Sequence, residues 1–416
     1  MLRKPKYWLL LILLAITIAG VFYLLRSAVG SPQRTPDFIS FYTAATILRQ
    51  PSGSQNLYNL ALQQNIQRQL APHGQFLPFF HTPLEAVLFE PFASLSLTQA
   101  FMLWSALNLA LLAVIFYLLW QTGYRLGTES YLAWIAVWFV PVAEAMAVGQ
   151  DSIFLALVFL ATFLALKKRH DVLAGLALGA GLYRFEIILP FAFIFLLRAR
   201  RKMLSGFFAA CAIWFLGSLA VVGWSGLRDY VAVLFVMGRT SGSGANGVIV
   251  RMMPSLRAAL VMLLGGKLPA FELFLIVLAG SVFLLGWAAW KFARVALPED
   301  RAFDLQFSLA VIAALLASYH LFTHELTPLI PVAFIVLAYE RQARSDGRLS
   351  VAKSVSLLLL CFLMFLGVGL TIHGVSLVFF ILLGLAIWLS LEITAIEKSA
   401  TAAKRVAEPA SLPEAP

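Results

Sequence analysis

Long apolar runs dominate this chain, and they restrict what it can fold into. One run covers residues 100–120 and another covers residues 269–291, and each can cross a bilayer as a helix. Hydrophobic residues make up 61% of the chain and charged residues 12%, with a mean hydropathy of +0.88. Because a soluble domain cannot bury that much apolar surface, we expect an all-α polytopic membrane protein.

The apolar runs predict about twelve transmembrane helices. They lie near residues 7–29, 100–120, 131–148, 151–167, 171–183, 185–198, 203–223, 269–291, 303–320, 325–340, 353–371 and 375–392. Most Lys and Arg fall in alternate short loops, which places both termini in the cytoplasm by the positive-inside rule. The net charge of +11 is therefore an orientation signal and does not indicate nucleic-acid binding.

Four segments follow from this topology. Residues 1–29 read as an uncleaved signal-anchor helix, since the apolar run is long for a signal peptide. Residues 30–99 form an extracytoplasmic loop with interfacial helices and a candidate catalytic acid. The bundle covers residues 100–392, and residues 393–416 read as a disordered cytoplasmic tail.

The apolar runs 171–183 and 185–198 are short, and basic residues flank both ends of the pair. Two short helices forming a hairpin satisfy this pattern, with Arg184 and Glu186 in a turn at or below the outer face. These charges can form an internal ion pair. Alternatively, Arg184 can hold an anionic group such as a lipid phosphate.

Asp37 is the first acid of the long outer loop. The segment PDFISFYTAATIL, which starts at Pro36, has the pattern of an interfacial helix. The acid is then either a plain N-cap or a general base that takes a proton from a substrate hydroxyl. The two roles are compatible at a membrane surface.

Other outer residues are candidates for substrate binding. His81 and Glu85 are four residues apart and can share a helix face, although surface polar residues are usually only solvated. Gln150 lies in the turn EAMAVGQDS, where the acids can also cap the next helix.

The loop SGSGANGVIVRMM carries Asn246 and Arg251, which can close over a substrate or belong to an ordinary loop. His320 and His324 stand one helical turn apart in YHLFTHELTP. Two histidines are weak evidence for a metal, so hydrogen-bonding or phosphate-facing roles are preferred to metal binding, with a purely structural role as the alternative.

The chain has no GxxxxGK[ST] or GxGxxG phosphate loop, and its cytoplasmic loops are too short for a nucleotide domain. Cys211 and Cys361 both lie in apolar runs and indicate neither a disulfide nor a metal site. We therefore expect no cofactor and no nucleic-acid partner.

Several segments in order resemble glycosyltransferase family 87. They are DFISFYTAA, EPFASLSLTQAFMLWSALN, GQDSIFLALVFLATFLAL, LAGLALGAGLYRFEIILPFAFIFLLRARR, NGVIVRMMPSLRAAL and SYHLFTHELTPLIPVAFIVLA. The resemblance implies a GT-C fold and a mannosyltransferase that uses polyprenyl-phosphate mannose. It also implies that Asp37 is the catalytic acid and that His320 or His324 is the active-site histidine. The family's hairpin usually turns with Lys-Pro, whereas this chain has Arg184-Phe185-Glu186.

The predicted function is inverting transfer of a hexosyl group, most readily mannosyl, from a polyprenyl-phosphate sugar to a lipid or glycan acceptor. The reaction takes place on the outer face of the cell membrane, among membrane lipids. Asp37 is the base, and Arg184 and Arg251 stabilise the leaving phosphate with His320 or His324. The alternatives are a polytopic transporter, a non-catalytic lipid-handling protein, or a GT-C enzyme with another lipid-linked sugar.

Overall fold

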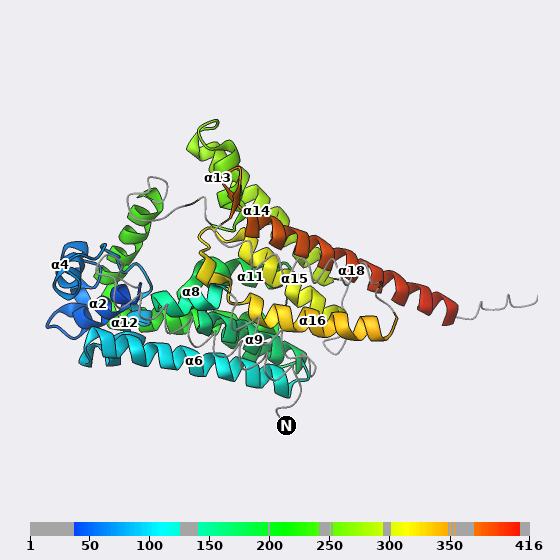
Figure 1. Ribbon diagram of the computed structural model, residues 1–416, viewed down its shortest axis with the longest axis horizontal. Coiled ribbons are helices and arrows are strands. Elements are labelled where there is room, and N and C mark those ends of the chain that lie inside the picture. Colours follow the sequence, from blue (N-terminus) through cyan, green and yellow to red (C-terminus); the bar gives the residue numbers. More distant parts are fainter. Residues whose placement is uncertain are drawn as a thin grey trace, which may run out of the picture.

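The computed structural model is a bundle of helices with a lobe of short helices at one end (Figure 1). It describes residues 37–124, 140–198, 200–240, 250, 253–293, 301–347, 350, 353 and 370–407. Its elements are α2 (Phe38–Leu48), α3 (Gly53–Asn56), α4 (Leu60–Leu70), α5 (Pro83–Phe89), η1 (Glu90–Ser94), α6 (Leu97–Gln121), α8 (Val140–Val148), α9 (Ser152–Lys167), α10 (Asp171–Gly179), η2 (Leu182–Arg184), α11 (Phe185–Leu197), α12 (Arg201–Thr240), α13 (Leu256–Leu264), α14 (Ala270–Ala293), α15 (Arg301–Ala317), η4 (Thr323–Leu326), α16 (Leu329–Ser345), β1 (Thr371–Ile372), β2 (Val375–Ser376) and α18 (Leu377–Ala407).

The lobe consists of α2 to η1, and α2 forms its centre. The sequence predicts an interfacial helix here, but nine of the eleven residues of α2 are buried. The reason is that α2 is apolar all round, and α3, α4, α5, η1 and α6 cover it. The predicted helix and its start after Asp37 are confirmed.

Two buried glutamines of α4 hold the extended chain that leads to α5. The side-chain amide of Gln67 exchanges two hydrogen bonds with the backbone of Leu77 (2.7 and 3.0 Å). Gln63, one turn earlier, accepts from the backbone N–H of Phe79 (2.8 Å). Side chains four residues apart on a helix match alternate residues of an extended strand in spacing. These hydrogen bonds fix the path of the backbone just before His81.

Helices α10 and α12 pack closely through small residues. A Cβ on Gly175 would lie 1.9 Å from the carbonyl oxygen of Met203, and one on Gly179 would lie 2.2 Å from Cβ of Ala210. The spacing Gly-x-x-x-Gly is typical of close helix contacts in membranes. The contact fixes α10, and η2 follows directly after it.

The polar site and the basic end of the bundle lie at opposite ends of α9. This helix starts at Ser152 beside the site and ends at Lys167, which pairs with Asp304 (2.7 Å). Fifteen residues of helix separate those ends by about 22 Å. The turn before α9 and Lys167 thus lie far apart, while the membrane orientation of the bundle stays a prediction.

Four described helices are long and apolar enough to cross a membrane: α6, Arg201–Val236 of α12, Ala270–Phe292 of α14, and Leu377–Ser399 of α18. The pair α10 and Leu182–Leu197 makes a fifth if it is one broken span. The two members of this pair are bent by 60°, a shallower turn than the predicted hairpin reversal. The figure of about twelve spans and the GT-C bundle stay predictions, and the signal-anchor run 1–29 lies outside the described residues.

The far end of α18 differs from the sequence interpretation. Residues 393–407, predicted to begin a disordered tail, continue this helix. Their sequence, ITAIEKSATAAKRVA, is rich in alanine and other good helix formers.

Candidate functional site

The turn Gly149-Gln150-Asp151 between α8 and α9 is the scaffold of the site. The indole N–H of Trp104 donates to the Gly149 carbonyl oxygen (2.9 Å), and the Asn108 amide donates to the Gln150 carbonyl oxygen (3.3 Å). Gly149 has φ +73°, and a Cβ there would lie 2.7 Å from Cβ of Phe38. Only glycine suits this backbone and this contact, and the contact brings α2 against the turn.

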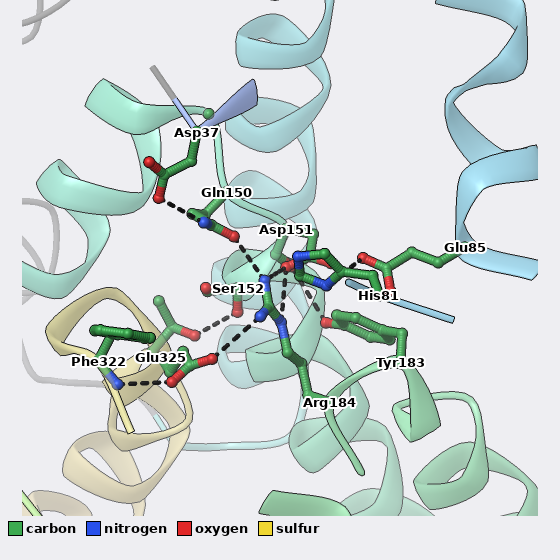
Figure 2. Close-up of polar contacts among 12 residues, drawn as sticks. Asp37, His81, Glu85, Gln150, Asp151, Ser152, Tyr183, Arg184, Phe322 and Glu325 are labelled. Atoms are coloured by element: carbon green, nitrogen blue, oxygen red, sulfur yellow. Dashed lines mark hydrogen bonds and ion pairs between the residues drawn. The ribbon is translucent and has the colours of Figure 1, made fainter. Parts of the chain in front are cut away.

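Asp37 precedes α2 at its N-cap position, but its side chain makes no capping hydrogen bond. Instead its Oδ2 accepts a hydrogen bond of 2.7 Å from Nε2 of Gln150 (Figure 2). Its Oδ1 has no hydrogen-bond partner among the described residues, and the side chain is partly exposed. The plain N-cap role is therefore the weaker of the two interpretations, and one carboxylate oxygen is available to a substrate.

Arg184 lies at the centre of the polar network, on the bend between α10 and α11. It donates from Nε and Nη2 to Oδ1 of Asp151 (3.1 and 2.6 Å). Nη2 also donates to Oε1 of Gln150 (2.6 Å), and Nη1 donates to Oε1 of Glu325 (3.2 Å). Four of its five N–H bonds thus have protein acceptors, and the side chain is only 6% exposed. The geometry favours the internal ion pair over a phosphate ligand.

The loop after α15 closes the network from the opposite side. Glu325 accepts from the backbone N–H of Phe322 through Oε2 (2.6 Å), which holds its other oxygen toward Arg184 (Figure 2). Thr327 donates to the Ser152 carbonyl oxygen, so the loop is also tied to the start of α9.

His324 in this loop is buried, stacks on Phe322, and has Nδ1 3.9 Å from Oε1 of Glu144. Burial opposes protonation, but the contact with Glu144 and the charges of Glu325 and Asp37 outweigh it, so the pKa of His324 is raised above 6.5. Its Nε2 has no hydrogen-bond partner in the described part of the chain. A partly protonated imidazole beside the carboxylates is the result.

His81 and Glu85 meet behind the network, with Nδ1 3.2 Å from Oε1. Burial raises the pKa of Glu85 well above its usual value, and Asp151 raises it further. Burial, Arg184 and His324 together lower the pKa of His81. Both shifts favour the neutral forms, so the contact is not a pair of full charges, and both oxygens of Glu85 are without a hydrogen-bond partner among the described residues. The two side chains lie close together, but the predicted shared helix face is wrong, because α5 begins at Pro83 and His81 lies before it.

The structure brings six of the predicted site residues together around Gln150: Asp37, His81, Glu85, Gln150, Arg184 and His324. Glu186 follows Arg184 in the first turn of α11, without a side-chain hydrogen bond to another described residue. His320 stands apart, because residues 318–322 are not helical and the two histidines face different neighbours. Asn246 and Arg251 lie outside the described residues.

Sequence reasoning did not select Asp151 and Glu325 as site residues. Asp151 had the pattern of a helix cap, but its side chain caps nothing and pairs with Arg184. The signal was the buried arginine itself, since a cation in an apolar hairpin requires counter-charges. Among the described residues, no group of three or more His, Cys, Asp or Glu side chains is placed to hold a metal.

The arrangement suits proton transfer from a hydroxyl. Among the described residues, one oxygen of Asp37 is free for a substrate, and the other is held by Gln150, whose side-chain Oε1 accepts a hydrogen bond from Arg184. A held carboxylate within reach of a substrate hydroxyl is the geometry of a general base.

The model of glycosyltransferase family 87 matches residues 79–318, which is 240 of the 416 residues. The match includes Gln150 and Arg184 but starts after Asp37 and ends before His320. No curated protein and no solved structure matches the chain.

Proposed function

The chain belongs to glycosyltransferase family 87, and from this premise we propose that it transfers a hexosyl group, most simply mannosyl, from a polyprenyl-phosphate sugar to a lipid or glycan acceptor. The observation that carries the proposal is the 2.7 Å hydrogen bond from Gln150 to Asp37. Gln150 lies inside the family match and Asp37 lies outside it. The bond therefore links the acid to the part of the chain that defines the family.

The proposed reaction is a single inverting displacement. The acceptor hydroxyl oxygen attacks the anomeric carbon and forms the new glycosidic bond, while the bond from that carbon to the phosphate oxygen breaks. The hydroxyl proton passes to Oδ1 of Asp37, and the lipid phosphate leaves with the electron pair. Positive charge near the departing oxygen stabilises this transition state. His324 offers such charge beside Asp37.

A lipid-linked donor fits the membrane context. The exposed face of α6 carries large apolar side chains, including Met102 (66% exposed) and Tyr117 (61% exposed), which suit contact with lipid. A donor whose tail lies among such helices reaches the site without a nucleotide domain, and the chain carries no nucleotide-binding motif.

The transporter alternative has less support. Transporters place ionisable groups within several long helices near mid-membrane. Helix α6 has no charged residue, and α14 has only Glu272 and Lys291, which lie near its ends. Beyond the first two residues of α12, charges inside the other two spans are confined to Arg228 and Asp229 of α12 and to Glu392, Glu397 and Lys398 toward the end of the α18 span. A related enzyme that uses another lipid-linked sugar is compatible with the same site.

The test is sugar transfer by the purified protein, with radiolabelled polyprenyl-phosphate mannose as donor and a membrane lipid extract as acceptor. We compare the wild type with Asp37→Asn, and with Asp229→Asn as a control for loss of an exposed carboxylate. Loss of the base should reduce transfer by about 10²- to 10⁴-fold. The control should keep full transfer.

Transfer that survives Asp37→Asn in a folded protein would refute the role of Asp37. Transfer from a glucosyl or arabinosyl donor, but not from the mannosyl donor, would keep the mechanism and replace the sugar. Uptake of a solute into vesicles without any transfer would favour the transporter.

A further inference from the structure

Arg257 is a buried cation with no carboxylate partner among the residues that the structure describes. It is the second residue of α13, and 9% of its surface is exposed. Nη1 donates to the carbonyl oxygen of Tyr319 (3.0 Å), and the guanidinium carbon lies 3.7 Å from the centroid of that ring. No other side-chain hydrogen bond or ion pair of Arg257 involves a described residue. A buried charge is costly unless it is paired, so this arginine is incomplete without an anion.

The contrast with Arg184 is clear. Asp151 and Glu325 already neutralise Arg184, and four of its N–H bonds are engaged. Arg257 has one engaged N–H bond and a planar face fixed by Tyr319. Free N–H bonds in a fixed fork are what recognise a phosphate group.

His320 provides a second group at the same place. Its ring centroid lies 5.1 Å from that of Tyr319, the ring on which Arg257 stacks. Burial, together with the charge of Arg257, lowers the pKa of His320 to about 4. The imidazole is thus neutral at neutral pH, keeps one N–H, and makes no side-chain hydrogen bond to a described residue.

We propose that Arg257 and His320 bind the phosphate group of the lipid-linked sugar donor, an inference that rests on the proposed function. Both contact Tyr319, at the start of the loop that carries His324 and Glu325, and hydrogen bonds through Arg184 and Gln150 connect Glu325 to Asp37. His320 and His324 are four residues apart, so their Cα atoms are at most about 14 Å from each other. A sugar held by its phosphate near His320 can extend across that interval toward the acid.

The phosphate-binding test measures equilibrium binding of a fluorescent short-chain polyprenyl phosphate to the purified full chain in detergent. The variants are Arg257→Gln and Arg257→Lys. The control is Arg344→Gln, which replaces an exposed arginine in the last turn of α16. Arg257→Gln should weaken binding by about 10- to 100-fold, because charge-assisted hydrogen bonds are lost. The affinity of Arg257→Lys should lie between those of the wild type and Arg257→Gln, and the control should bind as the wild type does.

A purely structural role predicts a different result. Removing an unpaired buried cation should leave the thermal midpoint of the free protein unchanged or raise it, whereas a structural arginine would lower it when replaced. Weaker binding with an unchanged or higher midpoint supports the proposal. Two results overturn the proposal. One is an Arg257→Gln protein that binds the polyprenyl phosphate as the wild type does, and the other is a lower thermal midpoint together with an equal loss of affinity for every ligand.

Two further ligands separate the sources of phosphate. Polyprenol without phosphate should bind equally to the wild type and Arg257→Gln. Phosphatidylglycerol should compete poorly, and equal loss of its binding would indicate a general headgroup site and overturn the donor assignment. Donor binding that depends on Arg257 without any sugar transfer would contradict the proposed function alone, since binding and transfer are separate readouts.

Discussion

Replacing Gln150 with leucine tests whether this residue positions the base. Arg184 only donates, so the amide oxygen of Gln150 must face Arg184 and its N–H group must face Asp37. Leucine removes both hydrogen bonds and keeps a similar volume. Each bond involves a charged group and contributes about 1.5–3 kcal/mol.

The two bonds act on different quantities. The bond to Asp37 orients the base, so its loss should lower kcat by about 10- to 150-fold, at about 1.4 kcal/mol for each factor of ten. The bond from Arg184 exists with or without substrate, so its loss should lower the stability of the protein. KM should change little, because Gln150 is proposed to act through Asp37 and not on the substrate.

The assay measures kcat, KM and the thermal midpoint for the wild type, Gln150→Leu and Gln306→Leu. Gln306 is a matched control, since it is buried and donates to the Lys291 carbonyl oxygen on the far part of α14. The control should lose stability but keep kcat. A folded Gln150→Leu protein with the kcat of the wild type would refute the positioning role.

Three further predictions concern titration and packing. His324 has a raised pKa in the folded state, so its stabilising charge is present below about pH 6.5 and is lost as the pH rises through that raised value. The rate of sugar transfer should therefore fall at alkaline pH. The His324→Gln variant should transfer slowly at every pH and show no such fall in its pH–rate profile. Glu85 also has a raised pKa, which makes the wild type lose stability as the pH rises above the usual glutamate range. Thermal midpoints should show Glu85→Gln level with the wild type at pH 4 and more stable at pH 7.5. Gly149→Ala should lower the free energy of unfolding by about 1–3 kcal/mol, measured by denaturation, because its φ of +73° and its contacts with Phe38 and Phe101 leave no space for Cβ. The opposite pH trend in either titration, or an unchanged Gly149→Ala stability, would contradict these assignments.

Local patterns predicted the parts of the lobe that depend on nearby residues. The helix after Asp37 follows from spacing and turn residues, whereas His81 contacts Glu85 from the extended chain before α5 and not from a shared helix face. The place of Asp37 in the outer loop made it a candidate base, and the family resemblance pointed to the same residue. Burial of α2 was not predicted, because an apolar helix at an interface and one inside a lobe have the same composition.

The network around Arg184 could not be predicted from spacing, because its members are far apart in the chain. Its hydrogen bonds to Glu325 and Asp151 span 141 and 33 residues. Helix capping offered a sufficient local explanation for Asp151, and nothing in the sequence ranked Glu325 above other outer acids. Arg257 was not selected for a similar reason, since only the fold reveals that no acid of the described residues pairs with it.

The counter-charges around each arginine explain why the two should differ in function. Asp151 and Glu325 leave the Arg184 cluster with a net charge of −1 when both are ionised, so an incoming phosphate gains nothing there. Arg257 keeps its full charge, and at an effective dielectric constant of 20 a unit anion 4 Å away is attracted by about 4 kcal/mol. The family's hairpin lysine presents a point charge, whereas the fork of Arg184 serves Asp151, Glu325 and Gln150 together. The altered turn is therefore consistent with a structural role of Arg184, which fixes Gln150 and through it the base Asp37. In the proposal the cation that binds the leaving phosphate is Arg257 on α13.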